Sequence, residues 1–536
     1  MSILVSSESG TLLKQLTGDV EKTKINGRNY TIENGTDEQE HNYVKYGNST
    51  ITTTTDNFGR TSSVTSSGYT LSYTYKGVTG SNATTNLVHT MSYELDEDDI
   101  AQYTYDYDSN GNITEVKEGN TVIAKYTYDE LNQLSTSADE NTGEFVEYIY
   151  NAGGNITQKK IYSLTTSMEQ GTLQDTIAYN YDSDWKDKLV SYDGDSISYD
   201  AIGNPMNYRD GMTMTWQDGR ELASITKNSI TYRFMYNLDG LRTQKIKEQG
   251  NTVLETVSYY YDSNNNLIGM KKGDTTVLYY YDSDGGLVSM SVEGSGNSSD
   301  TTYLFVKNLQ GDITKILDDS GDEVATYTYD AWGKILSETE NNAIAGLNPF
   351  RYRGYVYDSE TELYYLQSRY YDPLTGRFLN ADDPEYTDTN SGSPLSTNMF
   401  AYCENDPVSG YDPSGNWDKG DHRDLNSQLG FSKVTYQASI LADDTMYFFG
   451  NIKGSGYSSP FHSRDGKHSA PSLKIGMKLY NLALNYYKNY KKGYTGIKKF
   501  CFSDNKIQGR QVLSVNYFAF LNKNNWKPDT KYWQLL

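Results

Sequence analysis

Two histidines near the C-terminus lie in a short segment that could carry out acid–base chemistry. His462 and His468 lie within residues 461–469, which also contain Arg464 and Lys467. A histidine pair can act as general base and general acid when a ribose 2′-hydroxyl attacks the neighbouring phosphate. A guanidinium such as that of Arg464 could stabilise the charged phosphorane. The segment is therefore a candidate active site of a metal-independent ribonuclease, although most surface histidines have no such role.

The residues after this segment predict an amphipathic helix with a basic stripe. From 469 to 492, apolar residues recur at alternating spacings of four and three, which is the period of one helix face. A polar stripe beside them contains Lys474, Lys478, Lys488 and Lys492. Lysines in a row match the phosphate backbone of a nucleic acid, but a solvated helix face has the same pattern. Further segments at 434–440, 446–452, 497–502 and 512–521 are predicted to be strands, which makes this region α+β.

The charge of the chain changes sign at about residue 417. The 536 residues carry a net charge of −23. Residues 417–536 contain 18 Lys and Arg but only 8 Asp and Glu, a net of +10, so residues 1–416 have a net charge of −33. Such a break marks a domain boundary and indicates different partners on its two sides. An acidic container with a basic cargo and a basic domain that binds nothing special are equally compatible with it.

A short phrase recurs through the acidic part: Tyr-Asp or Tyr-x-Tyr-Asp, then Gly or Asn, then an apolar residue. Asp106 and Asp129 are 23 residues apart, and Asp262 and Asp282 are 20 apart. Alternation places the tyrosines on one face of a strand, the Asp opens a turn, and the Gly supplies a positive φ. Periods of this length are typical of repeat arrays. We therefore expect hairpins, two strands per repeat, in one long antiparallel sheet from residue 50 to residue 416.

These phrases, such as YDSNGNITEV from Tyr107 and YTYDAWGKILSE, resemble the YD repeats of RHS polymorphic toxins, Tc toxin C subunits and animal teneurins. The resemblance implies a mainly β fold class. YD-repeat hairpins would form a continuous spiralling antiparallel sheet that closes into a hollow shell, with a small α+β domain at the C-terminus. Residues 349–416 resemble the RHS-associated core through Tyr352-Arg353-Gly354 and the closing Asp412-Pro413-Ser414-Gly415.

The resemblance also implies a division into domains. Residues 1–100 would hold weaker repeats, 101–348 the clear YD repeats, 349–416 the core that plugs the shell, and 417–536 a variable, basic toxin domain.

In several members of this family the core is also an aspartyl autoprotease, in which two carboxylates share a proton. The matching positions in this chain are Asp383 and Asp412, with cleavage near the Asn416–Trp417 bond. The chain departs from the family pattern here. Asp383-Pro384 is followed by Glu385 and Tyr386, the two aspartates are 29 residues apart, and Asn416 replaces the usual leucine. These departures put self-cleavage in doubt, because Asp-Pro steps also simply make turns.

The leading functional hypothesis is an exported bacterial toxin for competition between bacteria, whose cargo is a nuclease acting on RNA. A cognate immunity protein is the expected partner. One alternative is a toxin of another chemistry, but an ADP-ribosyltransferase needs a catalytic glutamate and residues 417–536 contain none. The other alternative is a non-enzymatic surface adhesin, as the teneurin resemblance suggests.

Composition limits the other possibilities. The two cysteines, Cys403 and Cys501, cannot form a disulfide framework, and no spacing of Cys or His indicates a metal site or another cofactor. The first residues lack the pattern of a signal peptide, and no apolar run reaches transmembrane length. We therefore expect a secreted or cell-surface protein whose export machinery the sequence does not identify.

Overall fold

The computed structural model falls into two compact units, Met1–Gly430 and Phe431–Leu536. The described residues all belong to the first unit: 4–6, 13–17, 20–26, 28–39, 41–77, 84–293, 300–339, 342–382, 394–416 and 423–424. Apart from residues 423–424, the predicted α+β domain therefore lies outside the described residues, together with His462, Arg464, His468 and the lysines of the basic stripe.

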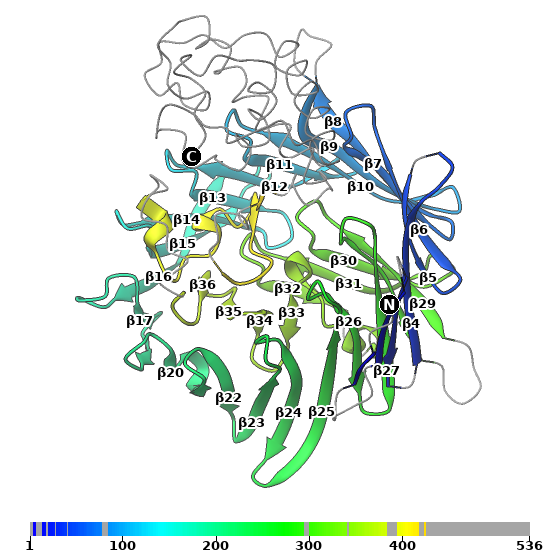
Figure 1. Cartoon of the computed structure of the whole chain (residues 1–536). Helices are drawn as coiled ribbons and strands as arrows, with labels where there is room; N and C mark the ends of the chain where they lie inside the picture. Colours follow the sequence, from blue (N-terminus) through cyan, green and yellow to red (C-terminus); the bar gives the residue numbers. More distant parts are fainter. Residues whose placement is uncertain are drawn as a thin grey trace, which may run out of the picture. The chain divides into compact units, whose positions relative to one another are not determined.

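The first unit consists mainly of antiparallel strands, in two large sheets and two small ones (Figure 1). The 18-stranded sheet contains β1 (Leu4–Ser6), β2 (Leu13–Thr17), β3 (Val20–Ile25), β4 (Arg28–Thr36), β5 (Asn42–Tyr46), β6 (Ser49–Thr55), β7 (Thr61–Ser66), β8 (Tyr69–Gly77), β9 (Thr84–Leu95), β10 (Asp98–Tyr107), β11 (Ile113–Glu118), β12 (Thr121–Tyr128), β13 (Leu134–Asp139), β14 (Glu144–Tyr150), β15 (Ile156–Leu164), β16 (Gln170–Tyr181), β17 (Leu189–Tyr192) and β18 (Asp195–Ser196). The 14-stranded sheet contains β19 (Ser198–Tyr199), β20 (Pro205–Asn207), β21 (Thr213–Gln217), β22 (Glu221–Lys227), β23 (Ile230–Tyr236), β24 (Arg242–Gln249), β25 (Thr252–Tyr261), β26 (Leu267–Lys272), β27 (Thr275–Tyr281), β28 (Leu287–Val292), β29 (Thr301–Lys307), β30 (Ile313–Leu317), β31 (Glu323–Tyr329) and β32 (Ile335–Glu338).

Strands that follow one another in the sequence are neighbours in both sheets. For example, β10 pairs with β9 and β11, and β24 pairs with β23 and β25, always antiparallel. The prediction of a mainly β protein built of hairpins is confirmed. The single continuous sheet is instead two sheets in series, which divide at Ile197, between β18 and β19. The hairpins also begin well before residue 50, because β1 to β5 precede it.

The repeated aspartate builds each turn as the sequence predicts. The Oδ1 atom of Asp108 accepts hydrogen bonds from the amides of Asn110 at 2.8 Å and Asn112 at 2.9 Å, and Gly111 has a φ of +92°. A short polar side chain that bonds its own backbone stabilises such a turn without help from distant residues. The same bond from the amide four residues on recurs at Asp56, Asp129, Asn151, Asp200, Asn237, Asp262, Asp282, Asn308, Asp318 and Asp330.

The tyrosine before this aspartate joins one repeat to the preceding one. The hydroxyl of Tyr128, before Asp129, donates to the carbonyl of Ile113 at 2.7 Å, and Ile113 is the fifth residue after Asp108. The same bond recurs along the array: a tyrosine hydroxyl donates to the backbone carbonyl of the fifth residue after the Asp or Asn of an earlier turn. The pairs are Tyr75 to Thr61, Tyr150 to Leu134, Tyr181 to Ile156, Tyr261 to Arg242, Tyr281 to Leu267 and Tyr329 to Ile313. The Tyr-Asp pair is thus a device that links consecutive hairpins.

Other tyrosines connect the two large sheets. Tyr46 of β5 donates to the carbonyl of Tyr281 in β27 at 2.9 Å, and Tyr69 of β8 donates to that of Phe305 in β29 at 2.7 Å. The ring of Tyr30 stacks on that of Tyr280 with centroids 5.9 Å apart. A tyrosine can bury its ring and still satisfy a backbone carbonyl through its hydroxyl, which explains why 51 tyrosines occur in this chain.

The core region, residues 342–382 and 394–416, contains little regular structure. Its elements are α1 (Ala343–Leu347), β33 (Val356–Asp358), β34 (Leu363–Leu366), β35 (Arg369–Asp372), β36 (Arg377–Phe378) and β37 (Gly410–Tyr411), with short 3₁₀ helices at Tyr352–Gly354, Pro394–Thr397 and Cys403–Asn405; β37 pairs with β38 (Arg423–Asp424). Figure 1 shows β33 to β36 beside the hairpins of the second sheet.

Buried ion pairs fasten this core region to the hairpins. Arg242 of β24 and Lys245 both contact the carboxylate of Asp358, with Lys245 Nζ at 3.0 Å from Oδ1. Burial alone would raise the pKa of Asp358, but the two cations outweigh it and hold the pKa below its usual value. Arg209 binds Asp372 at 2.8 Å, and Arg377 donates to the carbonyl of Gly154 at 2.9 Å. The core region therefore depends on both large sheets for its position.

Candidate self-cleavage site

One buried arginine brings together the two ends of the core region. Arg369, the first residue of β35, is 4% exposed. Its guanidinium lies 2.9 Å from Oδ2 of Asp382 and 3.7 Å from Oδ2 of Asp412. The ring of Phe378 covers one side of it, with its centroid 3.5 Å from the guanidinium carbon. Two carboxylates thus share one cation in a site from which the ring excludes water on one side.

The same arginine holds the backbone just before residue 417. Arg369 Nε donates a hydrogen bond to the carbonyl of Gly415, and a second guanidinium nitrogen donates to that of Met399 at 3.1 Å. The neighbouring Ser368 gives two hydrogen bonds to the carbonyl of Ser414, from its amide at 3.0 Å and its hydroxyl at 2.8 Å. Successive carbonyls at the end of the core region are therefore fixed and polarised by donors.

Asp412 organises the turn that carries these carbonyls. Its Oδ1 atom accepts from the amides of Ser414 at 3.2 Å and Gly415 at 2.8 Å, and its own amide donates to the hydroxyl of Tyr355 at 2.8 Å. Gly415 has a φ of +72°, and a Cβ atom there would lie 2.5 Å from the carbonyl oxygen of Leu366. The turn therefore requires glycine at this position.

The environment of Asp412 shifts its titration towards neutral pH. Burial raises the pKa of Asp412 to about 7, against the opposing effects of the Arg369 charge and of the amide hydrogen bonds from Gly415 and Ser414. The Asp382 carboxylate adds to the increase. A carboxyl group with this pKa can hold a proton near neutral pH and donate it to a leaving group.

Water can reach this turn. A cavity of about 340 Å³ beside it is lined by Ser414, Asn416 and Ser368, among others. Its lining also includes the acidic residues Asp218 and Asp239. The site therefore combines two carboxylates, a cation on a carbonyl and an adjacent cavity, which are the components that peptide hydrolysis by a carboxylate pair needs.

Comparison with known families identifies the array. The profile described as RHS Repeat matches residues 107–144, and the profile described as Teneurin YD-shell matches residues 279–408. The chain belongs to the RHS/YD-repeat family. The second match extends through Arg369 and Asp382 and ends just before Asp412.

Curated relatives and solved structures agree with this assignment. The chain is 30% identical over 374 residues to the tRNA3(Ser)-specific nuclease WapA of Bacillus spizizenii and 31% identical over 374 residues to the tRNA nuclease WapA of Bacillus subtilis. Each alignment covers 60% of this chain but only 15% of the relative. The crystal structure of TcdB2-TccC3 matches with a TM-score of 0.60 at 19% identity, over 76% of this chain and 22% of that one. This structural match shows a common fold.

The RHS/YD-repeat core region contains one of the two aspartates predicted from the sequence. Asp412 lies in the site, whereas Asp383 lies outside the described residues. Asp382 and Arg369 were not predicted. Asp382 and Asp383 are adjacent, and the prediction of Asp383, which precedes proline, stays a prediction. Only the fold brings Arg369 beside them.

The described residues contain no group of three or more His, Cys, Asp or Glu side chains arranged to hold a metal ion. In the same part of the chain, no helix has both the length and the apolar character needed to cross a bilayer.

Proposed function

We propose that this chain is the shell and cargo portion of an RHS-type toxin, which cleaves itself beside Asn416 and so releases residues 417–536 as a basic effector. The observation that supports it most is that Arg369 contacts Asp382, Asp412 and the Gly415 carbonyl together. Structural aspartates in turns are common, but a turn alone needs neither a second buried carboxylate nor a cation on the carbonyl that precedes Asn416.

The chemistry follows from these positions. The ionised carboxylate of Asp382 takes a proton from a water molecule, and the water oxygen attacks the carbonyl carbon. The guanidinium of Arg369 stabilises the negative charge that develops on the carbonyl oxygen. The protonated carboxyl of Asp412 gives its proton to the leaving amide nitrogen as the carbon–nitrogen bond breaks. The products are a carboxylate at the end of the shell and a free amine at the start of the effector.

The position of Arg369 favours cleavage of the Gly415–Asn416 bond over cleavage of the next bond, Asn416–Trp417. Its Nε atom holds the carbonyl of Gly415, which belongs to the Gly415–Asn416 bond. The sequence resemblance instead favours Asn416–Trp417. Both cuts release the whole basic segment, and the first amino acid of the fragment distinguishes them.

For the effector, we propose nuclease activity on RNA. Residues 417–536 have a net charge of +10 and contain the histidine pair and the lysine stripe. Two relatives are named as tRNA nucleases, although the chain spans only about 15% of their length. An acidic shell would attract the basic cargo until its release. On this proposal the protein is secreted or displayed by a bacterium, and an immunity protein protects the producing cell.

A second candidate function is adhesion at a cell surface without catalysis. The match of residues 279–408 to the Teneurin YD-shell profile favours it. Adhesion would need neither self-cleavage nor a basic effector, so the experiment below separates the two functions.

The test is self-cleavage of the purified full chain, followed by gel electrophoresis and intact mass measurement. The wild type should yield a fragment that begins at Asn416 or Trp417. Asp382→Asn and Asp412→Asn should each reduce the cleavage rate by on the order of a hundredfold or more. Asp383→Asn tests the aspartate predicted from the sequence, and Asp319→Asn at an exposed turn is the matched control. A wild type that stays intact, or a fragment that persists in Asp412→Asn, rules out the protease.

A further inference from the structure

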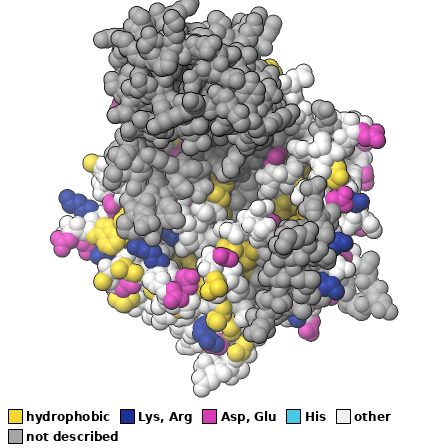
Figure 2. All heavy atoms as spheres, viewed as in Figure 1, with side chains coloured by type: hydrophobic (Ala, Val, Ile, Leu, Met, Phe, Trp, Pro, Cys, Tyr) yellow, Lys and Arg dark blue, Asp and Glu magenta, His cyan; other side chains and the backbone are white. Residues whose placement is uncertain are grey.

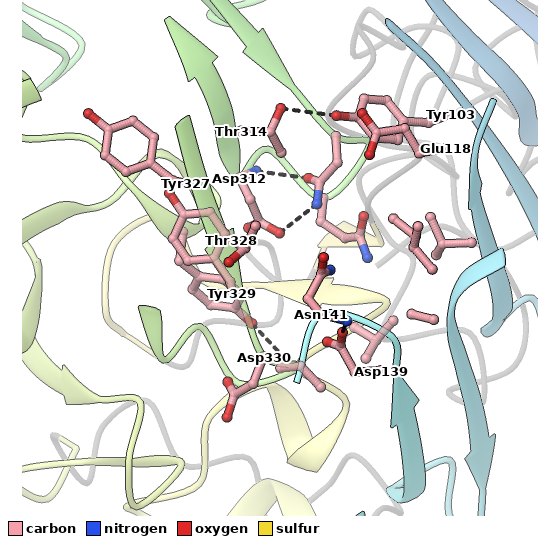
Figure 3. A pocket seen from close by; sticks show the side chains of 18 of the residues that line it. Tyr103, Glu118, Asp139, Asn141, Asp312, Thr314, Tyr327, Thr328, Tyr329 and Asp330 are labelled. Atoms are coloured by element: carbon pink, nitrogen blue, oxygen red, sulfur yellow. Dashed lines mark hydrogen bonds between the residues drawn. The ribbon is translucent and has the colours of Figure 1, made fainter. Parts of the chain in front are cut away.

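A second cavity lies between hairpins of the two large sheets. It has a volume of about 170 Å³ and is lined by residues of β10 to β12 on one side and of β30 and β31 on the other. Figure 3 shows Glu118, Asp139 and Asn141 on one side and Asp312, Tyr329 and Asp330 on the other. The core region contributes Tyr352, Arg353 and Val408 to its wall.

One buried acceptor in this cavity has no hydrogen-bond partner, and one buried carboxylate has no ion-pair partner, among the described residues. Gln310 is 5% exposed, and its Oε1 atom has no hydrogen-bond partner among the residues that the structure describes. Asp139 is 9% exposed and accepts from the amide of Asn141 at 2.8 Å, but no cation within the described part of the chain forms an ion pair with it. A buried acceptor without a donor is unfavourable, and a buried carboxylate without a cation is more so. Two donors of the wall, the Tyr327 hydroxyl and Arg353 Nε, also lack partners among the described residues, but neither bonds Gln310 Oε1 or Asp139. What the cavity lacks is a cation paired with Asp139.

The cations near the cavity are already engaged. Arg353 pairs with Asp312 at 3.3 Å, and Lys159 lies 3.8 Å from Asp330. Lys315 bonds Glu323 at 2.6 Å. None of these charges forms an ion pair with Asp139, so only a proton or a cation from outside the described residues can neutralise this carboxylate.

Much of the remaining wall is apolar. Val116, Ile123, Ala124 and Val408 line the cavity together with the rings of Tyr126 and Tyr329. Such a wall suits methylene groups, and tyrosine rings also attract a nearby cation. A wall that combines the Asp139 carboxylate and the unpaired Gln310 oxygen with hydrocarbon matches a ligand with a charged head and a short aliphatic body.

We propose that this cavity binds an aliphatic ammonium ion, with its nitrogen at the Asp139 carboxylate and Gln310 Oε1 and its methylene groups against Val116, Ile123 and Tyr126. The cavity volume of about 170 Å³ suits an aliphatic chain of a few carbons rather than a macromolecule. Burial, to which the Asp330 charge adds, raises the pKa of Asp139 to about 7 in the empty cavity. An ammonium ion would favour the ionised carboxylate, so binding should release protons near neutral pH.

The experiment is titration calorimetry of the full-length chain with n-butylammonium chloride, with n-butanol and KCl as matched probes. Butylammonium should bind with a single site, whereas butanol, which has the same body without the charge, should bind at least tenfold more weakly. KCl at equal concentration should give no heat of binding. This comparison needs no variant. If butanol binds as tightly as butylammonium, the cavity recognises only the hydrocarbon chain, and the proposal is overturned.

Variants then locate the site. Asp139→Asn should weaken butylammonium binding by about tenfold or more, and Gln310→Leu should weaken it several-fold, because each removes an acceptor. Asp319→Asn, at an exposed turn, should leave it unchanged. If Asp139→Asn fails to fold, as judged by circular dichroism, Glu118→Gln removes a second carboxylate from the cavity wall and should still weaken binding. Undiminished butylammonium affinity in Asp139→Asn, or in both Gln310→Leu and Glu118→Gln, would place the ligand elsewhere and overturn the proposal.

Discussion

The hydroxyl of Tyr128 donates a 2.7 Å hydrogen bond to the carbonyl of Ile113, the first residue of the strand that follows the previous turn. This bond, repeated along the array, fixes the distance between one Tyr-Asp pair and the turn before it. The Tyr-Asp spacing in the sequence is therefore the consequence of a contact between neighbouring repeats, in addition to the turn that the aspartate makes.

Removal of this hydroxyl should destabilise the repeats. Tyr128→Phe keeps the ring but leaves the buried Ile113 carbonyl without this donor, which should lower the free energy of unfolding by about 1 kcal/mol. The measurement is the urea midpoint of the full chain. Tyr43→Phe is the matched control, because the described residues offer its hydroxyl no hydrogen bond. Equal midpoints for the two variants would show that the bond contributes nothing net.

A methyl group at Gly415 should stop self-cleavage. In Gly415→Ala the added Cβ would meet the Leu366 carbonyl at 2.5 Å, so the Gly415 carbonyl must move away from Arg369. Gly47→Ala is the control, since Gly47 also has a positive φ, of +61°, but open space around the added Cβ. Both substitutions strain the backbone by on the order of 1 kcal/mol. Only Gly415→Ala should slow the appearance of the fragment, and a normal rate in it would exclude this carbonyl from the reaction.

The rate of self-cleavage should fall as the pH rises above 7. Asp412, with a pKa of about 7, acts in its protonated form. As the pH rises through 7 this form disappears, so the rate should fall roughly tenfold per pH unit at higher pH. Uncleaved chain from inclusion bodies, refolded in buffers from about pH 6 to about pH 9, gives the profile by gel densitometry. A rate that increases with pH over this range would assign Asp412 the opposite role, that of the base.

The released segment should degrade RNA without a metal ion. His462→Ala and His468→Ala in the full chain should each lower the rate by on the order of a hundredfold in the presence of EDTA. Lys478→Ala, in the basic stripe, should instead weaken binding and reduce its salt dependence by about one counterion. The substrate is a labelled tRNA mixture, and Lys45→Ala in the repeats serves as the control. Full activity of a variant lacking both histidines would require another active site.

The repeats could be predicted from the sequence because their determinants are local. Asp108 bonds amides two and four residues later, and Gly111 supplies the positive φ, so a short window holds all the information. The boundary at Ile197 could not be predicted, because strands β17 to β20 differ from their neighbours mainly in length.

The candidate site could be predicted only in part. Asp412 belongs to a recognisable turn, whereas the contact of Asp382 with Arg369 could not be predicted. The predicted partner Asp383 lies outside the described residues and stays a prediction. Periodicity gives no help where residues 379–381 leave the regular strand. Arg369 itself lies 43 residues before Asp412 in the sequence, and only tertiary packing brings the two side chains together.

The order of the strands has a consequence for synthesis on the ribosome. Within each large sheet, every strand after the first pairs with the one made just before it, so a new hairpin can dock as soon as it leaves the exit tunnel. Contacts such as Tyr46 with Tyr281 form only after a further 235 residues have been made. Arg369 and Asp412 emerge later still, so the candidate self-cleavage site is completed only after the hairpins that support it have formed.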